Sequence, residues 1–311
     1  GQEREIKGEM GIMNLENVKF NTDTKLVLNI GDPMGKTNAP RAYNKLFGEL
    51  DMNAIMLPVE VKKGMLPRFM EACKMLGIRY ISPTMPHKKD IIPLLDDVDE
   101  SSRIFQSVNA IRIDEDGTSH GVGMDGKGAL NAILSSGARL EGKEAVMLGS
   151  GSISGVIGLE LSKHGIRKLT ILNRTVKKAQ EIADILNTHT SMETRALAST
   201  PENLDKAAGT AQLFLQVTPL GMAGYGKTHE YLGFVDYLPK DCVVFDVIIN
   251  PADTPVIAAA RARGLKTVPG LKMLAGQMEA IFRFMFGVEL TQKDKDACIQ
   301  ELCRFLGVTV D

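Results

Sequence analysis

Short apolar runs alternate with amphipathic helical patterns between about residues 25 and 270. The apolar runs predict strands at residues 25–30, 53–61, 79–83, 107–113, 118–124, 211–218 and 241–248. Apolar positions at helical spacing predict helices at residues 39–50, 64–77, 176–187, 255–264, 273–286 and 293–306. Strands that alternate with helices in this way are typical of an α/β fold.

An acidic turn lies between two of the predicted strands. Its sequence, Asp114-Glu115-Asp116-Gly117, is typical of the short connection in a β-hairpin. A hairpin joins antiparallel strands, whereas a helical crossover joins parallel ones. We therefore expect the first sheet to be mixed rather than purely parallel.

A second series of elements begins at residue 145 with a strand, a glycine turn, a helix and another strand, ending near residue 175. This order is typical of one βαβ unit. Gly149 and Gly151 can bring backbone N–H groups close to a pyrophosphate at the positive end of the helix. Ser154 takes the place of the usual third glycine or alanine, so a tight turn without a ligand also fits the pattern.

The end of the next strand indicates which dinucleotide this turn would hold. An Asp or Glu usually binds the ribose 2′-hydroxyl of NAD there, but this chain has Asn173-Arg174-Thr175, followed by Lys178. An arginine can pair with a 2′-phosphate, which a carboxylate would repel. The sequence predicts NADP rather than NAD; the alternative interpretation of Arg174 is a solvated cation at a helix start.

Two further segments carry groups suited to proton transfer. Pro86-His87-Lys88 lies at a strand-to-helix junction, and Asp125 follows the predicted hairpin. A lysine and an aspartate meeting at one cleft could pass a proton to or from a substrate hydroxyl while a nicotinamide cofactor handles the hydride. Considered separately, Lys88 fits a surface lysine and Asp125 a helix N-cap. His87 is more typical of a structural hydrogen bond.

Composition excludes several classes of protein. The 311 residues include 37 basic and 38 acidic side chains, a net charge of -1, which disfavours general nucleic-acid binding. No apolar stretch approaches 18 residues, and the first twenty residues are charged. We expect a cytoplasmic protein without a signal peptide or a membrane span. No metal is expected, because the histidines and the four cysteines lack ligand spacing: Cys73, Cys242, Cys298 and Cys303.

Nine motifs occur in an order that resembles the shikimate dehydrogenase family, which includes shikimate and quinate dehydrogenases. The resemblance runs from about residue 31 to residue 287, and the motifs that carry it are GDPMGKTNAP, TMPHKKDIIPLLD, SVNAI, GMDGKG, GSGSIS, NRT, TPLGM, DVIINPADTP and GLKMLAGQ. The resemblance implies an N-terminal mixed-sheet α/β substrate domain at 1–125, completed by C-terminal helices at 270–311. It also implies a Rossmann NADP-binding domain at 126–269, with the active cleft between the two.

The resemblance further implies reversible reduction of 3-dehydroshikimate to shikimate. Lys88 matches the family's catalytic lysine and Asp125 its partner. The substrate-binding residues implied are Thr37, Ser82, Thr84, Asn109 and Gln277. The cofactor-binding residues implied are Gly149, Gly151, Ser152, Ile153, Asn173, Arg174, Thr175, Lys178, Thr218, Met222, Gly270 and Met273, of which the two methionines would lie near the nicotinamide.

Departures from the family pattern gather at substrate positions. Thr37 and Ala39 stand where the family usually has two serines, so one hydroxyl is missing. The other departures are Ser82-Pro83, Gly123-Met124, Ile249 and Lys272. Each lost buried hydrogen bond typically costs about 1–3 kcal/mol of binding free energy. We therefore expect these departures to alter substrate binding in the pocket. Lys36 or Lys272 could compensate by offering a cation to a carboxylate.

Two other functions remain open from the sequence. The protein could oxidise quinate or another cyclic polyol acid, or it could be a catalytically silent NADP-binding regulator, because fold alone does not secure function. Lys88 and Asp125 favour an enzyme, since a binder needs no acid–base pair. We expect a small cyclic hydroxy-acid as substrate, and the helices after residue 271 are compatible with a monomer or a homodimer.

Overall fold

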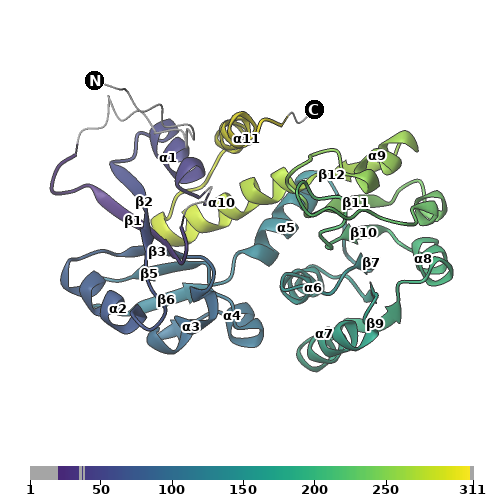
Figure 1. Ribbon diagram of the computed structural model, residues 1–311, viewed down its shortest axis with the longest axis horizontal. Coiled ribbons are helices and arrows are strands. Elements are labelled where there is room, and N and C mark those ends of the chain that lie inside the picture. Colours follow the sequence, from purple (N-terminus) through teal and green to yellow (C-terminus); the bar gives the residue numbers. More distant parts are fainter. Residues whose placement is uncertain (1–19, 35–36, 38, 309–311) are drawn as a thin grey trace, which may run out of the picture.

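The computed structural model describes residues 20–34, 37 and 39–308, and within them the chain forms two six-stranded sheets flanked by helices (Figure 1). The purple-to-blue first half of the chain builds one sheet and the teal-to-green second half builds the other. The yellow-green C-terminal helices lie back against the first half. This arrangement confirms the predicted α/β fold.

The first sheet is mixed, as the hairpin signal predicted. It consists of β1 (Lys25–Gly31), β2 (Ala54–Glu60), β3 (Tyr80–Pro83), β4 (Asp97–Val98), β5 (Ala110–Ile113) and β6 (Ser119–Val122), in the order β2-β1-β3-β5-β6-β4. β1 runs parallel to β2 and β3, whereas β5 is antiparallel to β3 and β6. The turn between β5 and β6 closes with Asp114 N donating to Thr118 O over 2.8 Å. Gly117 adopts φ 87°, which favours glycine.

Helices from both ends of the chain cover this sheet. They are α1 (Ala39–Glu49), α2 (Leu66–Met75), α3 (His87–Asp90), the 3₁₀ turn η1 (Ile92–Leu94), α4 (Glu100–Phe105), α10 (Gly270–Phe286) and α11 (Gln292–Leu306). Four aromatic rings join α1 to α10, with neighbouring centroids between 5.1 and 6.1 Å apart: Tyr43, Phe47, Phe282 and Phe286. Burial of these large rings ties the C-terminal helices into the core of the first half.

The second sheet is entirely parallel. Its strands are β7 (Glu144–Leu148), β8 (Lys168–Asn173), β9 (Glu193–Ala198), β10 (Leu213–Gln216), β11 (Val243–Asp246) and β12 (Lys266–Val268), in the order β12-β11-β10-β7-β8-β9. Its helices are α6 (Ser154–Lys163), α7 (Val176–His189), α8 (Pro201–Ala208), α9 (Pro255–Ala262) and the 3₁₀ turn η2 (Gly233–Tyr237). The strand order reverses direction between β7 and β10. Ligands of open α/β sheets bind at the carboxyl ends of the strands beside such a point.

Helix α5 (Asp125–Ser135) leads from the first sheet to the second and packs closely against α10 (Figure 1). Two glycines make the close approach possible. A Cβ on Gly128 would lie 2.2 Å from Cγ of Gln277, and a Cβ on Gly276 would lie 2.4 Å from the carbonyl oxygen of Gly128. This packing brings the side chain of Gln277 next to the first turn of α5.

Candidate active site

Lys88 and Asp125 meet although they come from different elements. Lys88 lies in α3 and Asp125 is the first residue of α5, and Lys88 Nζ is 3.2 Å from Asp125 Oδ2. Both side chains are partly buried, at 30% and 17% exposure. An ion pair with this exposure is shielded from bulk water but still open to a ligand, which suits a group that exchanges protons.

The local sequence explains why Lys88 is placed here. β3 ends at Pro83, and His87 N donates to Thr84 O over 2.8 Å, so the chain turns directly from strand to helix. His87 is completely buried, and its Nε2 lies 2.6 Å from Val61 O, which confirms the structural interpretation of this histidine. The Lys88 carbonyl accepts from Val108 N over 2.9 Å, which ties α3 to the segment that carries Asn109.

The carboxylate of Asp125 is held by three donors from three segments. Besides Lys88, Asn109 Nδ2 donates to Asp125 Oδ1 over 2.8 Å and Gln277 Nε2 donates to the same oxygen over 2.7 Å. The N-cap of α5 is Met124, which rules out the N-cap interpretation of Asp125. Met124 N instead donates to Asn109 Oδ1 over 2.5 Å, so the Asn109 amide is fixed at both ends.

A cavity of about 200 Å³ lies beside this pair. All seven residues expected to bind or convert the substrate line it: Thr37, Ser82, Thr84, Lys88, Asn109, Asp125 and Gln277. Cavities for drug-sized ligands usually span roughly 300–1,000 Å³, so this one suits a small substrate. Leu274, Met278 and Ile281 from α10 provide an apolar wall.

Sequence reasoning missed two polar residues of this cavity, Asn29 and Tyr43. Asn29 is 2% exposed; its Nδ2 donates to Ser82 O over 2.8 Å, and its Oδ1 accepts from Thr37 Oγ1 at 2.7 Å. Asn29 therefore holds Thr37 against the cavity. An asparagine inside the apolar run of β1 was the available signal, because a buried amide needs partners.

The departures from the family pattern occupy different places. Ala39 and Pro83 line the cavity, and Ser82 Oγ donates weakly to Asn109 O over 3.4 Å. Ile249 and Lys272 are not among the residues that line it. The cavity lining therefore gives no support to Lys272 as the compensating cation, and Lys36 lies outside the described residues.

A glycine turn follows β7, at the point where the strand order reverses. Gly149 adopts φ 118°, and a Cβ there would lie 2.9 Å from Thr218 Cγ2, so only glycine fits. α6 begins at Ser154, whose buried hydroxyl donates to Gly149 O over 3.3 Å. Ser154 therefore points inward and leaves the turn open, with Gly151 and Ser152 exposed and Ile153 partly buried. A pyrophosphate fits this cradle at a helix N-terminus.

The residues after β8 leave a cation free beside this turn. Asn173 Nδ2 donates to Thr175 O over 2.9 Å and shapes the bend. Arg174 and Lys178 are exposed, and in the described part of the chain neither side chain has a hydrogen bond or an ion pair. Arg174 is therefore available for an anionic group.

The remaining expected cofactor residues border the same edge of the second sheet. Thr218 follows β10 and donates from both N and Oγ1 to Gln216 Oε1, over 2.7 and 2.6 Å. Met222 is 41% exposed, whereas Met273 is 8% exposed. Gly270 begins α10, and a Cβ there would lie 2.4 Å from Ile248 O. The site as a whole fits a dinucleotide that approaches the small cavity from this edge.

Comparisons with known proteins agree with this geometry. A model of the shikimate dehydrogenase substrate binding domain matches residues 29–111, and one of shikimate/quinate 5-dehydrogenase matches residues 131–208. The NADP(+) shikimate dehydrogenase of Alkaliphilus oremlandii is 35% identical over 266 residues, which cover 84% of this chain and 91% of that protein. The chain belongs to the shikimate dehydrogenase family. The expectation drawn from the nine motifs is confirmed.

Solved structures of the family superpose along most of the chain. A shikimate dehydrogenase in complex with NADP+ is 28% identical with a TM-score of 0.76, covering 91% of this chain and 97% of that one. The ligand-free 5-ketofructose reductase of Gluconobacter sp. strain CHM43 is 27% identical with a TM-score of 0.81, covering 91% and 99%. Members of this fold therefore include a reductase named for a ketose.

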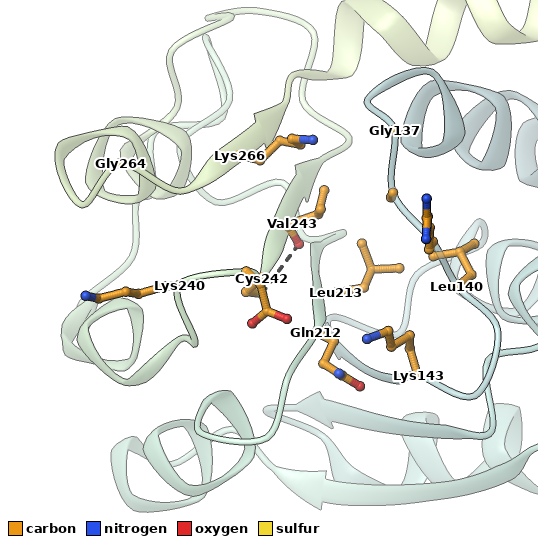
Figure 2. Close-up of a pocket in the computed structure, with 13 residues that line it drawn as sticks. Gly137, Leu140, Lys143, Gln212, Leu213, Lys240, Cys242, Val243, Gly264 and Lys266 are labelled. Atoms are coloured by element: carbon orange, nitrogen blue, oxygen red, sulfur yellow. Dashed lines mark hydrogen bonds between the residues drawn. The ribbon is translucent and has the colours of Figure 1, made fainter.

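A second, larger cavity of about 420 Å³ lies at the opposite edge of the parallel sheet (Figure 2). Gln212, Cys242 and Lys266, at the amino ends of β10, β11 and β12, line it. Its cations are Arg139, Lys143, Lys240 and Lys266. Helices α5, α8 and α9 end at this edge, where their dipoles favour cations, and Lys266 Nζ donates to Ser136 O over 2.8 Å. Lys266 thus complements a helix end, and the cavity lies away from the Lys88–Asp125 pair.

Neither a membrane helix nor a metal cluster is found in the described ranges. No helix there combines the length and apolar character needed to cross a bilayer. No group of three or more His, Cys, Asp or Glu side chains there is arranged to hold a metal ion.

Proposed function

We propose that the protein is an NADP-dependent shikimate dehydrogenase, which reversibly reduces 3-dehydroshikimate to shikimate. The observation that carries this function is the Lys88–Asp125 pair, at 3.2 Å, on the wall of a small cavity. Membership of the family supports it, as do relatives named NADP(+) shikimate dehydrogenases. A silent regulator is not favoured, because binding alone does not require this pair.

NADP fits the cradle at the carboxyl edge of the parallel sheet, and when bound it supplies or accepts the hydride. The N-terminus of α6 and the turn at Gly149, Gly151, Ser152 and Ile153 would hold the pyrophosphate. Asn173, Arg174, Thr175 and Lys178 would hold the adenosine 2′-phosphate, with Arg174 as the main cation. Thr218, Met222, Gly270 and Met273 would border the nicotinamide.

Lys88 would carry the proton. Its Nζ would donate a proton to the carbonyl oxygen of the substrate during reduction and take it back during oxidation. Asp125 would orient both the ammonium and a neighbouring substrate hydroxyl, and its own position is fixed by Asn109 and Gln277. A group held by three donors needs little rearrangement when the substrate arrives.

The remaining polar groups of the cavity would recognise the ring. Thr84, Asn109 and Gln277 would contact its hydroxyls, Thr37 would contact the carboxylate, and Ser82 would line the remaining part of the substrate site. This division supports a substrate domain at 1–125 with 270–311 and a cofactor domain at 126–269. A net charge of -1 supports a protein without a nucleic-acid partner. We also propose a cytoplasmic monomer or homodimer.

A steady-state assay of the purified protein tests this function. We expect NADP+ reduction with shikimate, and NADPH oxidation with 3-dehydroshikimate, at a kcat/KM well above that with NAD or with quinate. The same assay is repeated with 5-ketofructose as the competing substrate. Turnover of quinate or 5-ketofructose without turnover of shikimate would contradict the proposal. NADP binding without turnover of any of the three would favour the silent regulator.

A further inference from the structure

Tyr43 has a buried hydroxyl without a partner. The residue is 1% exposed, and its ring packs against Phe282 with centroids 5.7 Å apart. It lines the small cavity, yet within the described residues its hydroxyl oxygen has no hydrogen-bond partner. Buried hydroxyls are nearly always hydrogen-bonded. A buried hydroxyl that lines a cavity and has no partner therefore indicates that a ligand supplies the missing hydrogen-bond partner.

Two other hydroxyls that line the cavity are already engaged. Thr37 Oγ1 donates to Asn29 Oδ1 over 2.7 Å, and Ser82 Oγ donates to Asn109 O over 3.4 Å. Ala39 has no hydroxyl at all. The Thr84 hydroxyl also has no hydrogen bond in the described structure, but Thr84 is partly exposed, so the Tyr43 hydroxyl is the buried donor left uncommitted among the described lining residues.

Burial keeps this donor protonated. It raises the pKa of the Tyr43 phenol, and the nearby Ser82 side chain lowers that pKa by less. The hydroxyl therefore carries its proton at every pH at which the enzyme would be assayed. The charged side chains among the described lining residues are Lys88 and Asp125, which pair with each other.

We propose that the Tyr43 hydroxyl donates a hydrogen bond to a substrate oxygen other than the one that is reduced. It would take over the contact that a serine at position 39 would make, so Tyr43 is a specificity-determining residue. This inference rests on the proposed function. No hydrogen bond connects Tyr43 with Lys88 or Asp125 in the described structure, so its contribution is to binding rather than to proton transfer.

Tyr43→Phe tests the inference, because it removes one oxygen and leaves the ring. We expect the KM for shikimate to rise roughly 5–50-fold, the loss of one buried hydrogen bond, with kcat within about threefold and the KM for NADP unchanged. Tyr80→Phe is the matched control: Tyr80 lies in β3, packs on Phe286 and is not among the residues that line the cavity. It should leave all three constants unchanged.

Two further measurements separate substrate binding from a structural role. The melting temperature of ligand-free Tyr43→Phe should equal or exceed that of the wild type, since the removed hydroxyl had no partner. Adding Ala39→Ser to Tyr43→Phe should restore most of the lost affinity, because it returns a donor to the same wall.

The outcomes distinguish this inference from the proposed function. Wild-type turnover of shikimate together with an unchanged KM in Tyr43→Phe would overturn the inference and leave the function standing. A lower melting temperature of ligand-free Tyr43→Phe, without an effect on KM, would show that the hydroxyl is structural and would also overturn it. A wild type without shikimate turnover would overturn the proposed function and this inference with it.

Discussion

Gln277 Nε2 donates to Asp125 Oδ1 over 2.7 Å, across 152 residues of sequence. The contact exists because α5 and α10 approach each other at Gly128 and Gly276, where Cβ atoms would collide with the facing helix. The C-terminal helix therefore contributes a donor to the candidate site as well as covering the first sheet. The position of the Asp125 carboxylate depends on how tightly these two helices pack.

Replacing Gly128 with alanine should disturb both stability and activity. The new methyl group would lie 2.2 Å from Gln277 Cγ and 2.9 Å from Met273 O, so the helices must separate. Overpacking of this kind costs about 1–3 kcal/mol of unfolding free energy. We expect a lower free energy of unfolding in urea and a lower kcat/KM, because Gln277 moves away from Asp125.

Gly48→Ala is the matched control for this variant. Gly48 also lies in a helix, α1, but a Cβ there would meet no atom within 4 Å. Alanine should be neutral or should stabilise the protein by up to about 1 kcal/mol, with unchanged kinetics. Equal effects of the two substitutions would show that the α5–α10 contact does not position the site.

Replacing Lys88 with methionine should remove proton transfer and little else. Methionine keeps much of the length of the side chain and lacks the ammonium that lies 3.2 Å from Asp125. A positioned acid–base group contributes about 10²–10⁴-fold to a rate, so kcat for shikimate oxidation should fall by that factor. The dissociation constant of NADP, measured by fluorescence or calorimetry, should remain unchanged.

Lys89→Met provides the control, because Lys89 is exposed and follows Lys88 in the same short helix. It should retain full activity. Full turnover by Lys88→Met would mean that another group moves the proton.

Local signals were enough to predict much of the fold. The glycine turn at Gly149, the parallel second sheet and the hairpin at 114–117 each follow from residues close together in sequence. Helices α4, α5 and α8 and strands β4, β9 and β12 were missed. Several are short, such as the three residues of β12, and short segments become ordered through packing with distant neighbours rather than through their own pattern. Helix α5 has eleven residues, but glycines at its first turn, Gly126 and Gly128, weaken its helical pattern.

The site was less predictable for the same reason. Lys88 and Asp125 are separated by 37 residues, and it was the family resemblance rather than the spacing that predicted their contact. Tyr43 lies on the buried face of α1, where an aromatic residue predicts core packing. The missing partner of its hydroxyl depends on which groups the fold places around the ring, and the spacing of residues in the sequence does not show this.

Arg174→Glu should weaken NADP binding and spare NAD binding. Arg174 is exposed at the end of β8 and is free of ion pairs in the described part of the chain. Losing a charge-assisted contact and adding a repelling carboxylate should raise the dissociation constant of NADP by roughly 100-fold or more. The dissociation constant of NAD should change by less than about threefold, since NAD lacks the 2′-phosphate.

Arg139→Glu makes the same change of charge at the opposite edge of the sheet, beside the larger cavity. It should leave the dissociation constants of NADP and NAD unchanged. That result would show that the change in net charge does not cause the weaker NADP binding of Arg174→Glu. If Arg174→Glu bound NADP as tightly as the wild type, the 2′-phosphate would have to be held elsewhere.

Asp246 should make the stability of the fold depend on pH in the acid range. The residue is fully buried at the end of β11 and accepts hydrogen bonds from Thr254 Oγ1 at 2.6 Å and Ile248 N at 2.9 Å. Burial raises the pKa of this carboxyl to about 6, because the charged form loses its hydration, and the hydrogen bonds offset only part of that effect. In the unfolded chain the pKa returns to about 3.9.

Stability should therefore fall as the pH rises through this range. Between pH 4 and 6 the folded state binds more protons at Asp246 than the unfolded state does, so the free energy of unfolding decreases with pH and levels off above 6. The difference between the two pKa values corresponds to about 3 kcal/mol of unfolding free energy. Urea denaturation of wild type and Asp246→Asn between pH 4 and 7 measures this contribution, because asparagine does not titrate and the other groups cancel in the difference. Parallel profiles for the two proteins would show that Asp246 keeps an ordinary pKa in the fold.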